Sequence, residues 1–409
     1  MIPRNIITLS CLAVVVVVAL VGCQKPAEPL PLIDIQKDYD RPLPPGQFAL
    51  RKLTDPSMYP NFGDAWYKAK GLGLRKAVQH SIEYLNKPSS RNYYPIGPIT
   101  HERALASLEL FLGLLDHADS PQRLDTLIRD DFDVYISVGC DDMGTVLFTG
   151  YYSPIFNGSL ERTEQFRYPL YRLPPGFEKD ENGDPVGGPW HTREEIESGD
   201  LLAGNEIVWL GDAFEAYVIS VQGSGFIRLP DGELHEIGYA GHNGHDYTPI
   251  ARMMVADGLI DRYALSLDAM IRYFRDHPEK MNDYLYQNKR YIFFQDSKGG
   301  PFGCLGQPVT AYHSVATDKD IFPRACLAFV DTRMPHVPGQ SMRPFRYFVL
   351  DQDRGAAIRA PGRCDIYTGV GAEAGKMAGF TYSEGKLYYL FAKEGVTAAD
   401  TPLDQGPNT

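Results

Sequence analysis

The chain has 409 residues, of which 44% are hydrophobic, 12% aromatic and 22% charged, and these values exclude a disordered or collagen-like protein. At about 150 residues per domain, the length predicts two or three domains. The 40 Lys and Arg residues against 52 Asp and Glu residues give a formal net charge of −12, which argues against a nucleic-acid partner. A sugar polymer is not excluded, because sugars are bound by hydrogen bonds and ring stacking, and 25 Tyr and 20 Phe residues are present.

The N-terminus, residues 1–22, is typical of a signal peptide. An apolar run from Ile6 to Gly22 follows Arg4, is short for a membrane-spanning helix and contains no acidic residue. It ends in Leu20-Val21-Gly22-Cys23, which resembles the lipobox of bacterial lipoproteins. The resemblance implies cleavage before Cys23 and acylation of this residue, and several acyl chains would form a stable anchor. Since Gln24 is not Asp, we expect an outer-membrane lipoprotein facing the periplasm; the alternative is a plain secretory signal.

The remaining cysteines are too widely spaced to form a CxxC pair, so zinc-ribbon and thioredoxin sites have no support. The periplasm permits disulfides, and four cysteines allow three pairings. We expect mostly buried free thiols, with one pair left open, among Cys140, Cys304, Cys326 and Cys364.

In chain order, the sequence predicts a tether, a helical lead and then mostly strands. Residues 23–48 are Pro-rich and favour an extended, semi-rigid tether. Apolar residues at helical spacing predict helices over 65–85, 102–115, 121–132, 249–257 and 266–286. Runs rich in Val, Ile, Tyr and Phe predict strands over 145–152, 206–209, 216–221, 290–294, 346–350 and 386–391. Many short strands with few helical crossovers favour barrels over a doubly wound sheet.

Several familiar motifs are absent or incomplete. Gln222-Gly223-Ser224-Gly225 is not a nucleophile elbow, because Gln222 stands where that motif has glycine. The segment His242-Asn243-Gly244-His245-Asp246 could be read as a metal cluster, but its histidines lie in a Gly-containing loop rather than on one helix face. We therefore expect a solvated loop there, no metal site and no cofactor.

The densest group of ionisable residues lies between Phe348 and Tyr367 and contains Asp351, Asp353 and Asp365. Cleavage of an acetal requires a positioned acid, so these paired carboxylates are candidates for a catalytic site. Alternate residues of a strand share a face, so Arg363, Asp365 and Tyr367 should point one way, with Cys364 and Ile366 toward the core. By the same rule, Asp351 and Asp353 should share a face. The alternative is that these aspartates only cap turns or form surface ion pairs.

Several motifs together carry a family resemblance over about residues 100–392. The 3D domain, named for three aspartates, is suggested by SVATD at 314–318, DRGAAI at 353–358 and RCDIY at 363–367; upstream stand TGYY at 149–152, VQGSG at 221–225 and YAGHNG at 239–244. In this order they resemble the membrane-bound lytic murein transglycosylase A family. The chain departs from the family pattern at Arg354 and Ala356, where the family more often has Thr and Gly.

The resemblance implies a mainly β protein with N-terminal helices and two domains separated by a groove. A double-psi β-barrel catalytic domain would use residues 49–154 and 299–395, including the 3D motif region 311–392. A second β-domain, residues 155–298, would be inserted between those two segments.

The resemblance also implies cleavage of the MurNAc–GlcNAc β-1,4 bond of peptidoglycan without water, which forms 1,6-anhydroMurNAc ends. Asp365 would act as general acid and then as base, and it needs a raised pKa, which Arg363 on the same face would oppose. Asp353 would be the second carboxylate, and Asp318 would hold a loop that frames the site. The groove-lining residues implied are Thr149, Tyr151, Gln222 and Ser224, whose alternative role is packing at the domain junction.

Other functions remain open on the sequence alone. A hydrolytic glycosidase would use Asp365 and Asp353 as a pair that activates water. A non-catalytic lipoprotein would bind peptidoglycan without cleaving it, and a metalloenzyme is the remotest alternative. For the transglycosylase, the glycosidase and the binding lipoprotein alike, the expected partners are peptidoglycan glycan strands and the outer membrane. We expect a monomer.

Overall fold

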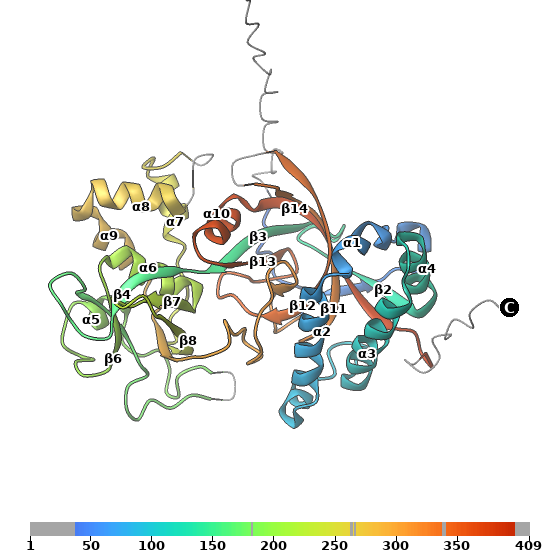
Figure 1. Ribbon diagram of the computed structural model, residues 1–409, viewed down its shortest axis with the longest axis horizontal. Coiled ribbons are helices and arrows are strands. Elements are labelled where there is room, and N and C mark those ends of the chain that lie inside the picture. The colour runs from blue at the N-terminus through green and yellow to red at the C-terminus, as the bar shows by residue number, and fades with distance from the viewer. Residues whose placement is uncertain (1–36, 181–182, 262–264, 266, 338–340, 397–409) are drawn as a thin grey trace, which may run out of the picture.

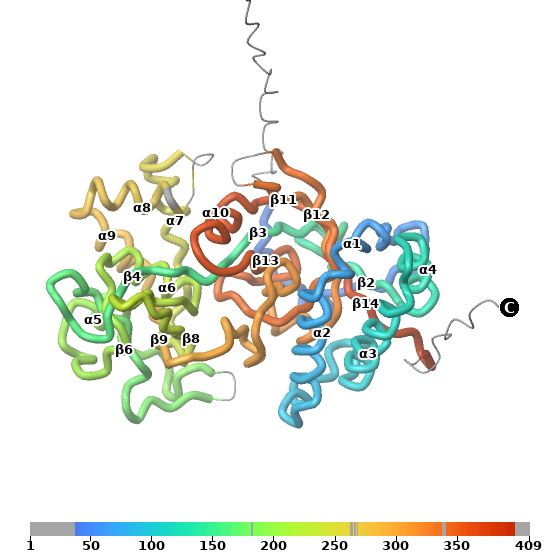
Figure 2. The backbone as a smooth tube through the Cα atoms, in the orientation of Figure 1, coloured from blue at the N-terminus to red at the C-terminus, as the bar shows by residue number. Residues whose placement is uncertain are grey.

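The computed structural model describes residues 37–180, 183–261, 265, 267–337 and 341–396. The predicted signal peptide, Cys23 and the first part of the predicted tether lie outside these residues. Figure 1 shows two lobes, one containing β4 to β9 and the other β1, β2 and β10 to β14. The chain crosses between the lobes from β3 to β4 and again after β9 (Figure 2).

The larger sheet combines both ends of the described chain. Its strand order is β1-β2-β14-β11-β12-β10-β13-β3, and β14 also pairs with β3. The last pairing closes a cycle of six strands, within which β10–β12 and β13–β3 are parallel pairs. The strands are β1 Leu50–Lys52, β2 Phe132–Ser137, β3 Val146–Ser153, β10 Ser314–Ala316, β11 Leu327–Pro335, β12 Met342–Asp353, β13 Arg363–Val370 and β14 Tyr382–Ala392.

The smaller sheet has six strands in the order β5-β6-β4-β7-β8-β9 and draws them all from residues 155–296. Its core contains Val208, Ile219, Ile237 and Phe294, each at most 1% exposed. The strands are β4 Ile155–Ser159, β5 Tyr168–Tyr171, β6 Glu206–Leu210, β7 Gly225–Arg228, β8 Leu234–His242 and β9 Ile292–Asp296.

Helices cover parts of both sheets. In the larger lobe, α2 packs on β12, α3 on β14 and α10 on β3 and β13, whereas α6 packs on β5, β6 and β9 of the smaller sheet. The bounds are α1 Trp66–Ala69, α2 Leu72–Leu85, α3 His101–His117, α4 Pro121–Asp131, α5 Arg193–Glu197, α6 Ala213–Gln222, α7 Ile250–Ala256, α8 Leu267–Asp276, α9 Met281–Leu285 and α10 Ala372–Phe380, with 3-10 turns at Pro56–Met58, Phe62–Ala65, Pro88–Tyr93 and Pro278–Lys280.

Local capping explains where the N-terminal helices begin. The Thr100 side chain accepts a hydrogen bond from the Arg103 amide at the start of α3, and Ser120 does the same for α4. One face of α3 then buries Leu108, Phe111 and Leu114 at helical spacing. The strong amphipathic pattern that predicts this helix is therefore confirmed.

The predicted strand over 216–221 is wrong, because this segment lies within α6. The Asp212 carboxylate accepts hydrogen bonds from the Phe214 and Glu215 amides, and the helix ends at Gly223 with φ of +79°. Residues of α6 from 216 to 220 are all buried. A helix that is buried on most sides shows no amphipathic period, so its apolar run looks like a strand.

Two predicted helices are interrupted. The segment 65–85 divides into α1 and α2 because Gly71 has an extended backbone with ψ of 146°. The segment 266–286 divides into α8 and α9, with Pro278 beginning the 3-10 turn between them. Residues 37–40 of the predicted tether pack on the larger lobe, where Tyr39 is buried and donates to Glu384.

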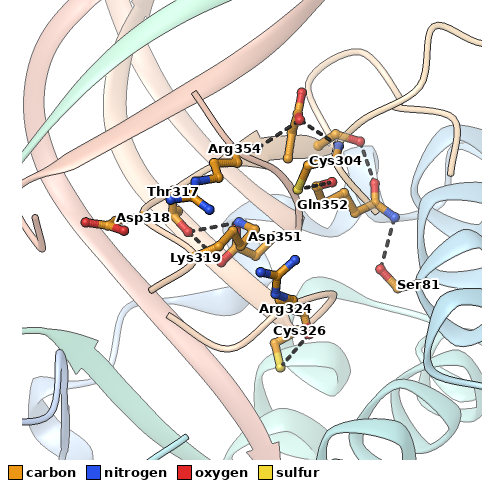
Figure 3. Close-up of polar contacts among 12 residues, drawn as sticks. Ser81, Cys304, Thr317, Asp318, Lys319, Arg324, Cys326, Asp351, Gln352 and Arg354 are labelled. Atoms are coloured by element: carbon orange, nitrogen blue, oxygen red, sulfur yellow. Dashed lines mark hydrogen bonds and ion pairs between the residues drawn. The ribbon is translucent and has the colours of Figure 1, made fainter. Parts of the chain in front are cut away.

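A fully buried ion pair lies behind the central strands. Lys319 pairs with Asp351, and both side chains are 0% exposed. The other carboxylate oxygen of Asp351 accepts hydrogen bonds from Thr317 Oγ1 at 2.7 Å and Tyr389 Oη at 2.6 Å. Figure 3 shows Lys319, Thr317 and Asp351 converging below the site. Both oxygens of this buried carboxylate therefore have partners in the core.

We predict that Lys319→Met lowers the free energy of unfolding by about 3–5 kcal/mol, because Asp351 would remain as an uncompensated buried charge. Chemical denaturation monitored by circular dichroism measures this. The matched control, Lys376→Met, removes an exposed ion pair with Glu373 and should cost at most about 0.5 kcal/mol. Equal unfolding midpoints for the two variants would contradict the role given to Lys319.

Candidate active site

Strand register aligns the two predicted carboxylates across three neighbouring strands. Ala316 on β10 pairs with Asp353 on β12 and with Asp365 on β13, and Asp365 pairs in turn with Thr149 on β3. Residues paired across a sheet share a face, so both carboxylates lie on one face with a small alanine between them. Two strand spacings put their Cα atoms roughly 9–10 Å apart before curvature of the sheet. The structure therefore brings Asp353, Asp365 and Thr149 together.

The expectation that Asp351 and Asp353 share a face is wrong. The register of β10 against β12 shifts here, with Val315 opposite Asp351 and Ala316 opposite Asp353, so that Gln352 is skipped. A bulge of this kind interrupts the alternation of side chains. Asp351 is consequently 0% exposed and paired with Lys319, whereas Asp353 is only half-buried on the site face.

The skipped Gln352 holds the bulge in place. Its buried side chain donates to the Ala77 carbonyl and to Ser81 on α2, and it accepts from Ser314 on β10 at 2.6 Å. Figure 3 shows Gln352 between Ser81 and the Cys304 loop. One amide thus joins a helix and two strands directly behind Asp353.

Asp365 has the environment of a carboxyl that retains its proton. Burial, its largest cause, raises the pKa of Asp365 from 3.8 to about 6; Thr149 and Arg363 lower it and Asp353 raises it. Its Oδ1 atom is buried without a hydrogen-bond partner among the described residues. Arg363 is itself paired with Asp40 at 3.0 Å, and its charge does not outweigh burial. As predicted, neighbouring Cys364 and Ile366 lie in the core.

Asp353 differs from Asp365 in having three hydrogen-bond donors around its carboxyl group. Oδ1 accepts hydrogen bonds from the backbone amides of Cys304 at 2.9 Å and Arg354 at 2.8 Å, and Oδ2 accepts from Tyr151 Oη at 2.8 Å. Burial, the largest cause, raises the pKa of Asp353 above its usual value, and the three donors partly offset that rise. The donors therefore favour the ionised form, whereas burial opposes it.

A close backbone approach makes the Cys304 contact possible. A side chain on Gly303 would put its Cβ 2.6 Å from the Gln352 carbonyl oxygen and 3.2 Å from the Asp353 carboxyl carbon. Only glycine fits at that distance, so the loop can reach Asp353. The sequence analysis missed Gly303 and Cys304, since a backbone donor has no side-chain signal.

The other predicted site residues lie where the two sheets meet. The ring of Tyr151 is 5.1 Å from that of Tyr367, whose hydroxyl is 3.2 Å from Ser153. Ser224 Oγ lies 3.3 Å from Ser153 Oγ, and Gln222 Oε1 accepts from the Tyr152 amide at 3.1 Å. Gln222 and Ser224 thus connect α6 and β7 to β3, next to the site.

Asp318 is buried and contacts a loop rather than the site face. Its Oδ2 accepts a hydrogen bond from the Ala360 amide at 2.9 Å, and Ala360 has a φ of +65°. This contact fixes the β12–β13 connection, which carries Arg354.

Within the described ranges, the cysteines and histidines do not form a metal centre. Cys140, Cys326 and Cys364 are buried free thiols and Cys304 is an exposed one. Among the described residues, no group of three or more His, Cys, Asp or Glu side chains is placed to hold a metal ion. His245 Nε2 instead lies 2.7 Å from the Trp190 carbonyl.

Comparisons with known proteins agree with this arrangement. Residues 147–295 match the family described as the MltA specific insert domain, and residues 313–391 match the 3D domain. The chain is 30% identical to the membrane-bound lytic murein transglycosylase A of Escherichia coli K12 over 262 residues, which cover 63% of this chain and 69% of that protein. For the Vibrio cholerae protein of that name, identity is 30% over 65% of this chain and 70% of that protein.

Solved structures show the same fold. The membrane-bound lytic murein transglycosylase of Agrobacterium tumefaciens superposes with a TM-score of 0.69 at 26% identity, covering 84% of this chain and 98% of that one. E. coli MltA with bound chitohexaose superposes with a TM-score of 0.63 at 23% identity, covering 87% and 96%.

Two carboxyl groups on one sheet face, one of them a buried acid with a raised pKa, are an arrangement typical of enzymes that cleave glycosidic bonds. Within that class, the matches identify a lytic transglycosylase. The chain belongs to the membrane-bound lytic murein transglycosylase A family and carries a C-terminal 3D domain. In the part of the chain that the structure describes, no helix has the length and apolar character needed to cross a membrane.

The raised pKa of Asp365 makes a prediction about stability. Since the folded-state pKa lies above the unfolded value, folding is favoured when the group is protonated, and stability falls as pH rises from about 4 through about 6. Asp365→Asn should therefore be more stable than the wild type at pH 7 to 8 by about 1–3 kcal/mol. Urea unfolding at both ends of the range measures this.

At pH values near 4 the advantage of Asp365→Asn should disappear, because the wild-type acid is then neutral in both states. Asp116→Asn, which changes an exposed partner of Arg75, should be neutral throughout. If the difference in stability between Asp365→Asn and wild type is the same at pH 8 as at pH 4, the pKa of Asp365 is not raised by folding.

Proposed function

We propose that this enzyme cleaves the MurNAc–GlcNAc β-1,4 bond of peptidoglycan without water and leaves 1,6-anhydroMurNAc ends. The observation that carries the proposal is the environment of Asp365. This carboxyl has a pKa of about 6, one oxygen without a partner among the described residues, and a place on the same sheet face as a second carboxyl group. It is therefore available as a proton donor near neutral pH.

The reaction then needs one acid. Protonated Asp365 gives its proton to the glycosidic oxygen as the bond to MurNAc C1 breaks. The MurNAc 6-hydroxyl attacks the same C1 atom, and the Asp365 carboxylate removes the hydroxyl proton. An intramolecular nucleophile requires no activated water and no covalent enzyme intermediate, because it is already held next to C1. Asp365 ends the cycle protonated.

Asp353 is the second carboxylate of this mechanism. Its three hydrogen-bond donors favour the ionised form, and its charge acts on the same sheet face as Asp365. A fixed negative charge stabilises the oxocarbenium character of the transition state and raises the pKa of Asp365. Tyr151, whose own pKa is raised above its usual value by burial, remains a hydrogen-bond donor to Asp353.

We further propose that the closed cycle of six strands is a double-psi β-barrel formed by residues 49–154 and 299–395. Residues 155–298 would be an inserted domain, with the substrate groove between the two. The position of Thr149 beside Asp365, and the contacts of Gln222 and Ser224 across the junction, support a place for these residues along the groove. E. coli MltA has been solved with bound chitohexaose, a sugar oligomer, which supports a glycan-binding groove.

The cellular location follows from the sequence rather than from the described residues. We propose that Cys23 carries the lipid anchor and that the monomeric enzyme faces the periplasm from the outer membrane. The residues that follow Cys23 would then let the catalytic body reach the glycan strands, and the names of the relatives include membrane-bound.

We predict that residues 24–409 digest purified peptidoglycan to muropeptides with 1,6-anhydroMurNAc ends, which are one water lighter than reducing ends. Asp365→Asn should lower the rate by about 100-fold or more, because the amide has no proton to donate. Mass spectrometry of the digest measures both. Asp116→Asn, at an exposed site far from the sheet face, is the matched control and should act like wild type.

The alternatives give different digests. Reducing ends would indicate a hydrolase in which Asp365 and Asp353 activate water as a pair. Peptidoglycan left intact by wild type and variant alike would indicate a non-catalytic binding protein.

The pH dependence of kcat/KM should report the same acid. Activity should fall about tenfold per pH unit above the pKa of Asp365, near 6, because the proton donor is lost. Arg363→Gln should move this fall in kcat/KM to higher pH, since Arg363 lowers the pKa of Asp365. Arg252→Gln, which removes the other partner of Asp40, should leave the pH of this fall unchanged. Identical shifts in both variants would contradict the assignment of Asp365 as the titrating acid.

A further inference from the structure

Three arginines influence one another near the end of β12: Arg354, whose backbone amide donates to Asp353, Arg359, which contacts the same Asp320 carboxylate as Arg354, and Arg290. Arg354 and Arg359 follow β12, and Arg290 precedes β9. Burial is the main cause that lowers the pKa of Arg290, and the charges of Arg359 and Arg354 lower it further. The three guanidinium groups, which we call the arginine cluster, therefore lie within electrostatic range of one another although they come from different lobes.

Arg290 is a partly buried cation, and the carboxylate charge that acts on it is that of Asp184. Its Nη1 donates to the His245 carbonyl at 2.9 Å, whereas its Nε is buried and lacks a hydrogen-bond partner. No ion pair of Arg290 is found among the residues that the structure describes. A desolvated charge of this kind is costly, and a buried donor without an acceptor adds to the cost. An anionic ligand would remove both penalties.

The other two arginines share one weak internal partner. Arg354 Nη2 lies 3.0 Å and Arg359 Nη1 lies 3.5 Å from the same carboxylate oxygen of Asp320, which is 59% exposed. Exposed ion pairs of this type contribute little to stability, so a ligand carboxylate can replace Asp320 as the partner of the two arginines. The backbone of Arg354 meanwhile holds Asp353, which fixes the cluster directly beside the proposed reaction centre.

Tyr239 and His242 form a surface beside the arginine cluster that suits a sugar carrying a substituent. The ring of Tyr239 on β8 is 45% exposed, and the His242 ring lies 6.4 Å from it. Burial, followed by the charge of Arg290, lowers the pKa of His242 to about 4, so this ring is neutral at neutral pH. Asp184 lies 3.4 Å from His242 Nε2 and is 61% exposed. The positive charge around His242 therefore comes from Arg290, Arg354 and Lys179.

We propose that the arginine cluster binds a carboxylate carried on the lactyl group of MurNAc, supplied either by the lactyl acid itself or by the peptide attached to it. This inference rests on the proposed function. GlcNAc has no such substituent, so recognising it sets the register of the strand and brings MurNAc C1 to Asp365. Arginine suits the task because its planar fork matches a carboxylate with two hydrogen bonds.

The test uses the full chain in detergent with Arg354→Thr, Arg290→Gln and the double variant. Arg228→Gln, an exposed arginine at the end of β7 in the smaller sheet, is the matched control. Three ligands are compared: peptide-bearing strands, strands whose peptides were removed to leave the lactyl acid, and chitohexaose, which has no carboxylate. KM and kcat are measured for the two strands, and Kd for chitohexaose.

We expect the double variant to raise KM for the peptide-bearing strands roughly tenfold, the effect of one lost charge-assisted contact, with a smaller change in kcat. Its Kd for chitohexaose should stay within about twofold of wild type. Wild-type KM should rise with salt, and the double variant should lose most of this dependence. A defect on both strands identifies the lactyl acid, and a defect on the peptide-bearing strands alone identifies the peptide.

Equal weakening of strands and chitohexaose, or no change in KM for either strand, would overturn the carboxylate subsite. Arg290 also donates to the His245 carbonyl, so Arg290→Gln could fail to fold. Arg354→Thr is then the deciding variant, because the ion-pair partner of its side chain among the described residues is exposed Asp320. Failure of the proposed function is recognised separately, since wild type would then give no 1,6-anhydro product from any strand.

Discussion

The site depends on the way Asp351 is held inside the larger sheet. Lys319, Thr317 and Tyr389 satisfy this carboxylate where no water reaches it, so it can be neither rotated outward nor left unpaired at small cost. With Asp351 fixed inward, the skipped residue Gln352 lets Asp353 face outward only one residue further along. A bulge stabilised from behind thus separates a structural carboxylate from a functional one.

The two site carboxyl groups show how one sheet face can give two acids different surroundings. Asp353 accepts three hydrogen bonds, two from backbone amides, whereas Asp365 has a buried oxygen with none among the described residues. Burial raises the pKa of both groups, and at Asp353 the three donors oppose that rise. In the proposed mechanism, Asp365 is the acid and Asp353 is the second carboxylate.

The junction between the sheets is as important as the site face. Gln222 and Ser224 contact β3 from the smaller lobe, and the charge of Arg354 lowers the pKa of Arg290, which precedes β9 of the smaller sheet. Side chains of the smaller lobe therefore act on the candidate site in addition to forming their own core. Substrate selection by the arginine cluster would be a property of the two lobes together, because no single lobe contains all three guanidinium groups.

Sequence alone determined the amphipathic helices such as α3, the placement of Cys364 and Ile366 in the core, and, through several motifs in order, the family. The role of Asp365 as the acid stays a prediction from those motifs. It could not place Asp351 and Asp353 on different faces, because a bulge changes the side-chain alternation without a residue-type signal. It mistook α6 for a strand, since burial on most sides hides the helical period. The three hydrogen-bond donors around Asp353 and the arginine cluster were decided by tertiary structure. Backbone amides and residues from distant segments meet only after both sheets have formed.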